Sequence, residues 1–166
     1  TALLFGLDLD YVSLTLPRIP CAEEAEKITA LAELCSENFA DYNAERMARL
    51  IKKRMSSGEI FVIEHKNNIA GFIMFSKKNK TIDHIAVSPD YRRIGIASRL
   101  MVTAMAQFEV GEELSAVTFR QEHPMSDGVS RMYKKFGFDD EKNIVVRGEP
   151  LVKRTAVVPE KAIITE

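Results

Sequence analysis

The fold is decided by residues 84–101, which read HIAVSPDYRRIGIASRLM. A short apolar strand leads through a proline-containing turn into a basic, glycine-bearing loop, and an amphipathic helix follows. The first N–H groups of a helix have no intrahelical partner, and the helix dipole adds partial positive charge at that end. The stretch therefore predicts an anion-binding turn of the kind that holds phosphates.

Residues 92–98, the basic loop, supply the chemistry that a phosphate requires. Gly95 lets the backbone approach an anion without a side chain in the way, and Arg92 and Arg93 add full positive charges. The spacing Arg92-x-x-Gly95-x-Ala97 is neither the glycine pattern of a dinucleotide fold nor a Walker loop. The alternative interpretation is a solvated turn that happens to carry two arginines.

The spacing in the basic loop resembles the acyl-CoA-binding signature, Gln/Arg-x-x-Gly-x-Gly/Ala, of the GNAT superfamily of N-acetyltransferases. The segment Tyr133-Lys134-Lys135-Phe136-Gly137-Phe138 is similar to the Tyr-x-x-x-Gly-Phe segment of the same family. The two motifs occur in the family's order and on the expected elements. The resemblance implies a GNAT fold along nearly the whole chain.

The chain has 166 residues and a net charge of −1, which favour a single domain, residues 1–166, and give no reason to expect nucleic acid or an anionic membrane as a partner. No apolar run approaches the roughly 20 residues that a spanning helix needs. Cys21 and Cys35 are too few for a disulfide framework or a structural zinc site. We therefore expect a cytoplasmic protein with reduced thiols and no metal.

Hydrophobic periodicity predicts an α/β (α+β) protein with about seven strands and four helices. The resemblance to the GNAT family implies that the strands form one mixed central sheet flanked by the helices. Helices are expected at about 22–39, 43–57, 96–108 and 126–136. Strands are expected at about 12–16, 59–66, 69–76, 81–87, 115–120, 143–147 and 151–158, and residues 2–5 could form a further short strand.

The resemblance implies that acetyl-CoA is the cosubstrate and assigns residues to its two ends. The pyrophosphate would be held by the basic loop: Arg92, Arg93, Ile94, Gly95, Ile96, Ala97 and Ser98. The pantetheine arm would lie along the strand 81–87, where Ile85, Ala86 and Val87 would offer main-chain groups while their side chains belong to the core.

An amine must be neutral to attack a thioester, and an alkylamine has a pKa of about 10.4, so a general base is useful. Strict alternation places Asp83 on one strand face with Ile85 and Val87, and the family often has its base on this face. Asp83 is the first candidate, although it could instead pair with a nearby Lys or Arg. His84 is expected on the opposite face in a structural role; it, Glu122, His123 and water remain reserve candidates.

The departing thiolate must receive a proton, and the match to the Tyr-x-x-x-Gly-Phe segment assigns this general-acid role to Tyr133. A tyrosine has a reference pKa of about 10, close enough to that of a thiol to serve. A tyrosine on a buried helical face can also be plain core.

The predicted function is direct transfer of the acetyl group from acetyl-CoA to a primary amine of a small molecule or protein N-terminus. Substrate choice is assigned to the first two helices, their connection and the final hairpin. There Asp41, Tyr42 and Glu45 could attract a cationic amine, or the acids could simply serve the helix dipole. A non-catalytic acyl-CoA-binding module and an unrelated nucleotide-binding domain are the alternatives. Monomer and homodimer both remain open.

Overall fold

The computed structural model describes residues 15–160, so the strand expected at 2–5 and most of the one at 12–16 lie outside the described residues. The described elements, in chain order, are η2 (Ala22–Glu24), α2 (Ala25–Leu34), η3 (Ser36–Asn38), α3 (Ala44–Ser57), β1 (Ile60–His65), β2 (Asn68–Ser76), β3 (Thr81–Val87), η4 (Pro89–Tyr91), α4 (Ile96–Met105), β4 (Glu113–Phe119), α5 (Ser126–Lys135), β5 (Asp140–Val146) and β6 (Glu149–Val157).

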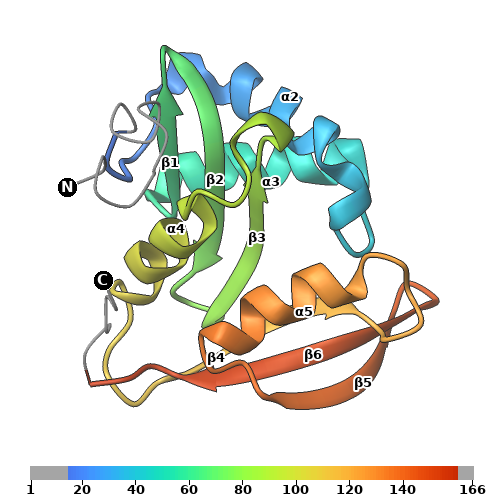
Figure 1. The fold of residues 1–166 in the computed structure, drawn as a ribbon. Coiled ribbons are helices and arrows are strands. Elements are labelled where there is room, and N and C mark those ends of the chain that lie inside the picture. Colours follow the sequence, from blue (N-terminus) through green and yellow to red (C-terminus); the bar gives the residue numbers. More distant parts are fainter. Residues whose placement is uncertain (1–14, 161–166) are drawn as a thin grey trace.

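The strands form one sheet in the order β1-β2-β3-β4-β6-β5 (Figure 1). β1, β2 and β3 are antiparallel neighbours, and so are β4, β6 and β5, whereas β3 and β4 run parallel. The expected mixed α/β fold with four helices is confirmed. The sheet within residues 15–160 has six strands, where the sequence predicted about seven.

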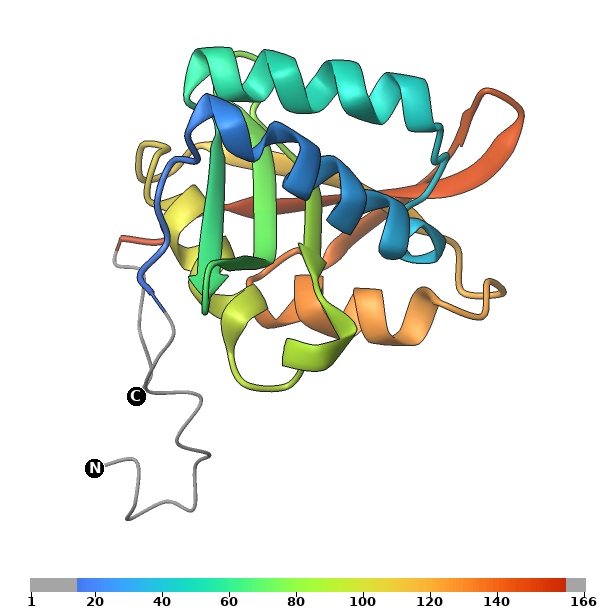
Figure 2. The ribbon, with the colours of Figure 1, turned by 90° about the horizontal axis from the view of Figure 1, so that it is seen from above.

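The helices cover both faces of the sheet, with α2 and α3 on one face and α4 and α5 on the other (Figure 2). Each pair of helices buries its own apolar cluster against the strands. Gly71 of β2 explains how closely α4 packs, because a Cβ there would lie 2.9 Å from the Ala86 carbonyl oxygen and from the Ile96 side chain. Packing of this kind holds the N-terminus of α4 firmly beside β3.

The sheet is divided between β3 and β4. These two strands pair only at Thr81 and Ser115, near the start of each, and then diverge (Figure 1). Beyond this point the edge of β3 that faces β4 is left without a strand partner. The opening lies at the carboxyl end of β3, where the chain enters the basic loop.

A β-bulge in β3 makes one part of the sequence prediction wrong. Phe75 pairs with Ile82 and Met74 pairs with His84, which leaves Asp83 as an extra residue. Ile82 therefore packs in the same cluster as Ile85 and Val87 instead of on the opposite face. Strict alternation fails at a bulge because two residues oppose one.

The first helix also ends earlier than predicted. α2 stops at Leu34 and the chain continues through the 3-10 turn η3, so Phe39 is not on the helix. Ser36 and Asn38 favour this ending because their side chains compete with the backbone for hydrogen bonds. The turn brings Phe39 against His84, with ring centroids 5.1 Å apart.

The two predicted hairpin turns are shifted and tightened. Their centres are Lys66-Asn67 and Arg147-Gly148, all four with positive φ, which is the signature of two-residue hairpin turns. β6 therefore begins at Glu149 and includes Pro150, two residues earlier than the predicted start at 151.

Candidate active site

A cleft of about 1000 Å³ passes through the opening between β3 and β4. On the α4–α5 face its walls include the basic loop and the side of α5 that carries Tyr133. On the opposite face they are formed by α3, by the connection before it and by the ends of β5 and β6. The cleft therefore joins a basic anion site to a second chamber across the sheet.

The basic loop adopts the conformation that an anion site requires. Arg93 and Gly95 both have positive φ, at 66° and 87°, which turns the chain sharply into α4. Converging N–H groups in such turns bind anions. Gly95 is the N-cap of α4 and gives it no side-chain cap, so the first helical N–H groups face the cleft at Ile96, Ala97 and Ser98.

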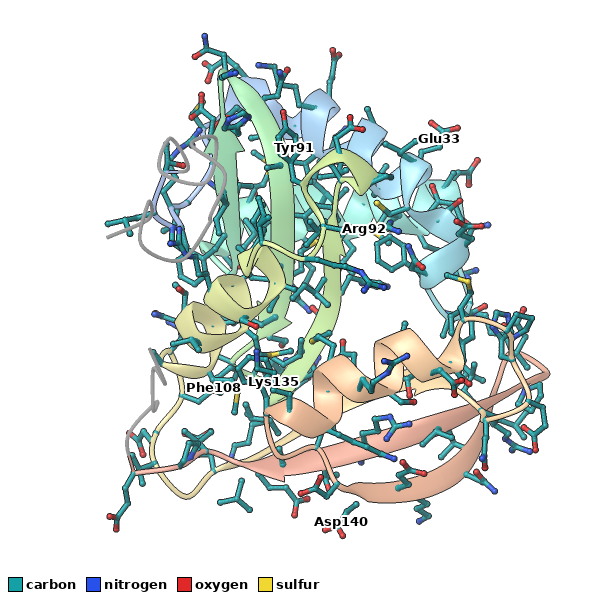
Figure 3. All side chains as sticks on the ribbon, viewed as in Figure 1. Glu33, Tyr91, Arg92, Phe108, Lys135 and Asp140 are labelled. Carbon is teal, nitrogen blue, oxygen red and sulfur yellow. The ribbon has the colours of Figure 1, made fainter. Side chains whose placement is uncertain are left out.

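The loop is anchored where the chain leaves η4, at Tyr91 and Arg92. The Tyr91 hydroxyl lies 3.0 Å from Nδ1 of the buried His65 on β1. Arg92 donates from Nε to the Val87 carbonyl oxygen at 3.1 Å and extends toward the space between β3 and α5 (Figure 3). These contacts fix where the loop sits relative to the end of β3.

The main chain of β3 points into the opening at alternate residues. Ser88 donates its N–H to Ala70 of β2, so the groups of Val87 and Ile85 are directed away from β2. The contact of Arg92 with the Val87 carbonyl agrees with this direction. The structure therefore leaves polar backbone groups of β3 available for an extended ligand.

Tyr133 lies on α5 beside the opening, with its side chain against Phe138 at 5.4 Å between ring centroids. Burial raises the pKa of Tyr133 above its ordinary value, so the hydroxyl stays protonated at neutral pH. Lys135, two residues further along α5, donates to the Ser98 hydroxyl at 3.0 Å beside the N-terminus of α4 (Figure 3).

Asp83 lines the cleft but is already engaged in hydrogen bonds. One carboxylate oxygen accepts from Arg54 Nε at 2.7 Å and the other accepts from the Thr81 hydroxyl at 2.8 Å. Arg54 is only 5% exposed and also lies 3.5 Å from Glu59. Asp83 therefore pairs with a nearby arginine, as the alternative interpretation of this residue predicts.

His84 lines the same wall of the cleft as Asp83. Its Nδ1 is buried and has no hydrogen-bond partner within residues 15–160. Burial lowers the pKa of His84 to about 4, so the ring is neutral at physiological pH. A neutral imidazole with an unpaired nitrogen can accept a proton or a hydrogen bond from a ligand.

The chamber on the other side of the sheet, called here the α3 chamber, has apolar walls and a charged rim. Its apolar residues are Phe39, Tyr42, Met47, Leu50, Val117, Val146 and Leu151, and its charged residues besides Asp83 are Asp41, Arg46 and Arg147. Asp41 accepts hydrogen bonds from both arginines through its carboxylate. Asp41, one of the acids that could attract a cationic amine, is thus already paired with two arginines.

A scan against protein-family models matches residues 56–140, just over half of the chain, to the acetyltransferase (GNAT) domain. The chain belongs to the GNAT acetyltransferase family. A search of curated proteins finds no match.

Solved structures of GNAT proteins share the fold of this acetyltransferase. A GNAT-family acetyltransferase from Bacillus cereus is 17% identical with a TM-score of 0.66, over 87% of this chain and 96% of that one. The yncA protein of Salmonella typhimurium, solved with its cofactor acetyl-CoA, is 15% identical with a TM-score of 0.62, over 90% and 96%. Diaminobutyrate acetyltransferase EctA from Paenibacillus lautus, in complex with L-2,4-diaminobutyric acid and coenzyme A, is 17% identical with a TM-score of 0.64, over 87% and 95%.

The acetyltransferase cleft gathers most of the residues that the sequence singled out. Ile85, Ala86, Val87 and all of the basic loop except Ile94 line it, together with Asp83, His84 and Tyr133. Ile94 packs against the apolar core instead. Glu122 and His123 do not line the cleft; His123 is exposed, and its ring stacks on Phe119 at 3.7 Å.

Several polar residues of the cleft region were missed from the sequence. Lys135 lies within the second motif, and the basic neighbourhood of that motif could have suggested it. Arg54 and Arg147 carry no local signal because their partners, Asp83 and Asp41, lie 29 and 106 positions away. Arg46 lies only five positions from its partner Asp41, but no sequence pattern marks that pair. No group of three or more metal-binding side chains occurs within residues 15–160, and no helix in that range could span a membrane.

Proposed function

We propose that this acetyltransferase transfers the acetyl group of acetyl-CoA directly to a primary amine in a ternary complex. The observation that carries the proposal is the continuous cleft between β3 and β4, with a basic anion site at one end and a separate chamber at the other. A thioester held in the opening can be reached by an amine from the opposite face. Direct transfer then needs no covalent enzyme intermediate.

The basic loop would hold the pyrophosphate of acetyl-CoA. Arg92 and Arg93 supply charge, and the uncapped N–H groups at Ile96, Ala97 and Ser98 supply donors. The pantetheine arm would extend along β3, where main-chain groups of Ile85 and Val87 are directed into the opening. The thioester would then lie between His84 and Tyr133.

The chemical step requires two proton movements. The amine nitrogen attacks the thioester carbonyl carbon, the C–S bond breaks, and its electron pair passes to sulfur. Tyr133, kept protonated by burial, would donate its proton to the sulfur and recover one from solvent.

The amine proton has two candidate acceptors in the cleft wall. Asp83 was the first choice from sequence, but both of its oxygens already accept hydrogen bonds from Arg54 and Thr81. His84 has an unpaired nitrogen and a pKa lowered by burial to about 4, so it would accept the proton briefly and pass it to solvent. We propose His84 for this step and a positioning role for Asp83.

Calorimetric titration with acetyl-CoA tests the proposal. Wild type should bind, and the double variant Arg93→Glu/Gly95→Val should not, because it reverses a charge and strains a residue with positive φ. Arg131→Glu, an equal charge change at an exposed position on α5, is the control and should bind as wild type does. A folded wild type that fails to bind acetyl-CoA would remove the basis of the proposal. Binding without thiol release on any primary amine would instead favour a non-catalytic acyl-CoA module.

A further inference from the structure

The charges in the α3 chamber do not cancel. Asp41 is held by Arg46 at 3.1 Å and by Arg147, so one carboxylate faces two guanidinium groups. Asp83 also borders the chamber, but it is hydrogen-bonded to the buried Arg54 behind it, which Glu59 also approaches at 3.5 Å. Glu45 points away from the chamber and pairs with Arg49 on the outer surface of α3. One positive charge at this rim is therefore without a counter-charge.

The guanidinium of Arg147 has N–H donors that Asp41 does not use. Arg147 is 57% exposed at the tip of the β5–β6 turn and donates to Asp41 through one nitrogen only. A guanidinium carries five N–H donors in a fork that matches a carboxylate. Asp41 itself has positive φ and is also contacted through its carbonyl oxygen by Arg46, which fixes the pair in one place.

Besides Asn38, Asn43 and Thr118, the remaining walls of the chamber are apolar. Phe39 and Tyr42 stack with ring centroids 6.2 Å apart, and Met47 and Leu50 of α3 continue the surface toward the opening. A polyamine would place further positive charge beside two guanidinium groups that already share the one carboxylate of Asp41. A ligand with an apolar body and one carboxylate fits both the walls and the rim.

On this basis, and resting on the proposed function, we propose that the acceptor is an amino-carboxylate with an apolar body, its carboxylate bound by Arg147 beside Arg46 and its amine directed to the opening. The site thereby selects an acid-bearing amine over a polyamine. Asp41 acts as the positioning residue that holds the two arginines together.

Matched pairs of amines test this inference: leucine against isoamylamine, and phenylalanine against phenethylamine, with spermidine as the polycation. Each is titrated into the protein saturated with CoA, and acetylation is followed by thiol release from acetyl-CoA. We expect each amino acid to bind at least about tenfold more tightly than its decarboxylated partner, the range of one charge-assisted hydrogen-bonded contact. The difference should appear in KM more than in kcat.

Variants of single arginines test which residue causes the preference for amino acids over their decarboxylated partners. Arg147→Gln should remove the preference for the amino acid while leaving the decarboxylated amine within about twofold of wild type, and Arg147→Lys should restore part of it. Arg49→Gln, an exposed arginine on the same helix as Arg46, is the control and should change neither ligand.

The outcomes separate this inference from the proposed function. Equal or better binding of the decarboxylated amines or of spermidine overturns the inference, and transfer to those amines would leave the acetyltransferase proposal intact. Failure of every amino acid to bind in the presence of CoA also overturns the inference. Failure of acetyl-CoA itself to bind counts against the proposed function.

Discussion

Strand β4 has two edges with opposite properties. Along one edge it pairs with β6 from Glu113–Val157 to Phe119–Leu151 without interruption, and along the other it meets β3 only at Ser115. The closed edge satisfies its backbone groups internally, whereas the open edge leaves those of β3 for a ligand. The same strand therefore stabilises one half of the sheet along its paired edge and borders the candidate active-site cleft along its open edge.

Each edge is supported by a buried arginine. Beside the closed edge Arg154 of β6 is 3% exposed and donates to Thr118 and Ser130. Beside the open edge Arg54 holds the bulged residue Asp83. A buried ion pair contributes little net stability compared with apolar residues, but breaking it by removing one partner is costly. Substitutions beside the closed edge and beside the open edge therefore test how the two edges differ.

The largest expected effect is on chemistry at the open edge. Tyr133→Phe removes the proposed general acid and should lower kcat by about 10² to 10⁴, the range for a lost proton donor. The phenyl ring still packs on Phe138, so acetyl-CoA affinity should stay unchanged. Steady-state kinetics and calorimetry measure the two quantities. A kcat close to wild type would eliminate Tyr133 as the acid.

At the closed edge, we expect a substitution to lower the stability of the protein. Arg154→Met leaves the buried Thr118 hydroxyl without its partner and should lower the free energy of unfolding by about 2–3 kcal/mol. Lys153→Met, at the exposed neighbouring position on β6, is the control and should stay within about 0.5 kcal/mol. Urea unfolding measures both. Equal losses in the two variants would mean that the Arg154 network is not what holds this edge.

The open edge should also respond to pH. The folded-state pKa of His84 is lowered to about 4 from an ordinary 6.5, so the unfolded chain takes up the proton first as the pH falls. Stability should therefore decline as pH falls from 6.5 toward 4, by about 1 kcal/mol between pH 7 and pH 5 after allowing for solvent in the cleft.

His84→Asn should remove this part of the pH dependence, as measured by urea unfolding at the two pH values. His123→Asn, at an exposed histidine, is the matched control and should keep the wild-type slope. An unchanged slope in His84→Asn would show that the ring titrates equally in the folded and unfolded chains.

The smallest effect is expected where α5 meets the basic loop. Lys135→Met removes a positive charge 3.0 Å from Ser98 and should weaken acetyl-CoA binding by about three- to fivefold at low salt. Lys134→Met, which changes an exposed lysine paired with Glu141 at 3.7 Å, should leave the affinity unchanged. Calorimetry at two salt concentrations measures the difference. Equal weakening in both variants would point to a general charge effect instead of a local contact.

Much of the fold followed from sequence because its signals are local. The periodicity of residues 60–76 and 96–105 predicts elements that the structure contains. The two hairpin turns lie at other residues than predicted, because several neighbouring polar residues can each adopt the positive φ that such a turn requires. The bulge at Asp83 could not be predicted, since it depends on pairing with Phe75 of another strand.

The sequence by itself determined the basic loop before α4 and the family to which the chain belongs. Arg92, Gly95 and the start of α4 are contiguous, so their chemistry is fixed by local backbone conformation. Tertiary structure alone decided the α3 chamber, where Asp41 meets an arginine 106 positions away. It also decided that Asp83 is paired and that His84 is not, because burial and partnership are properties of surfaces brought together by folding.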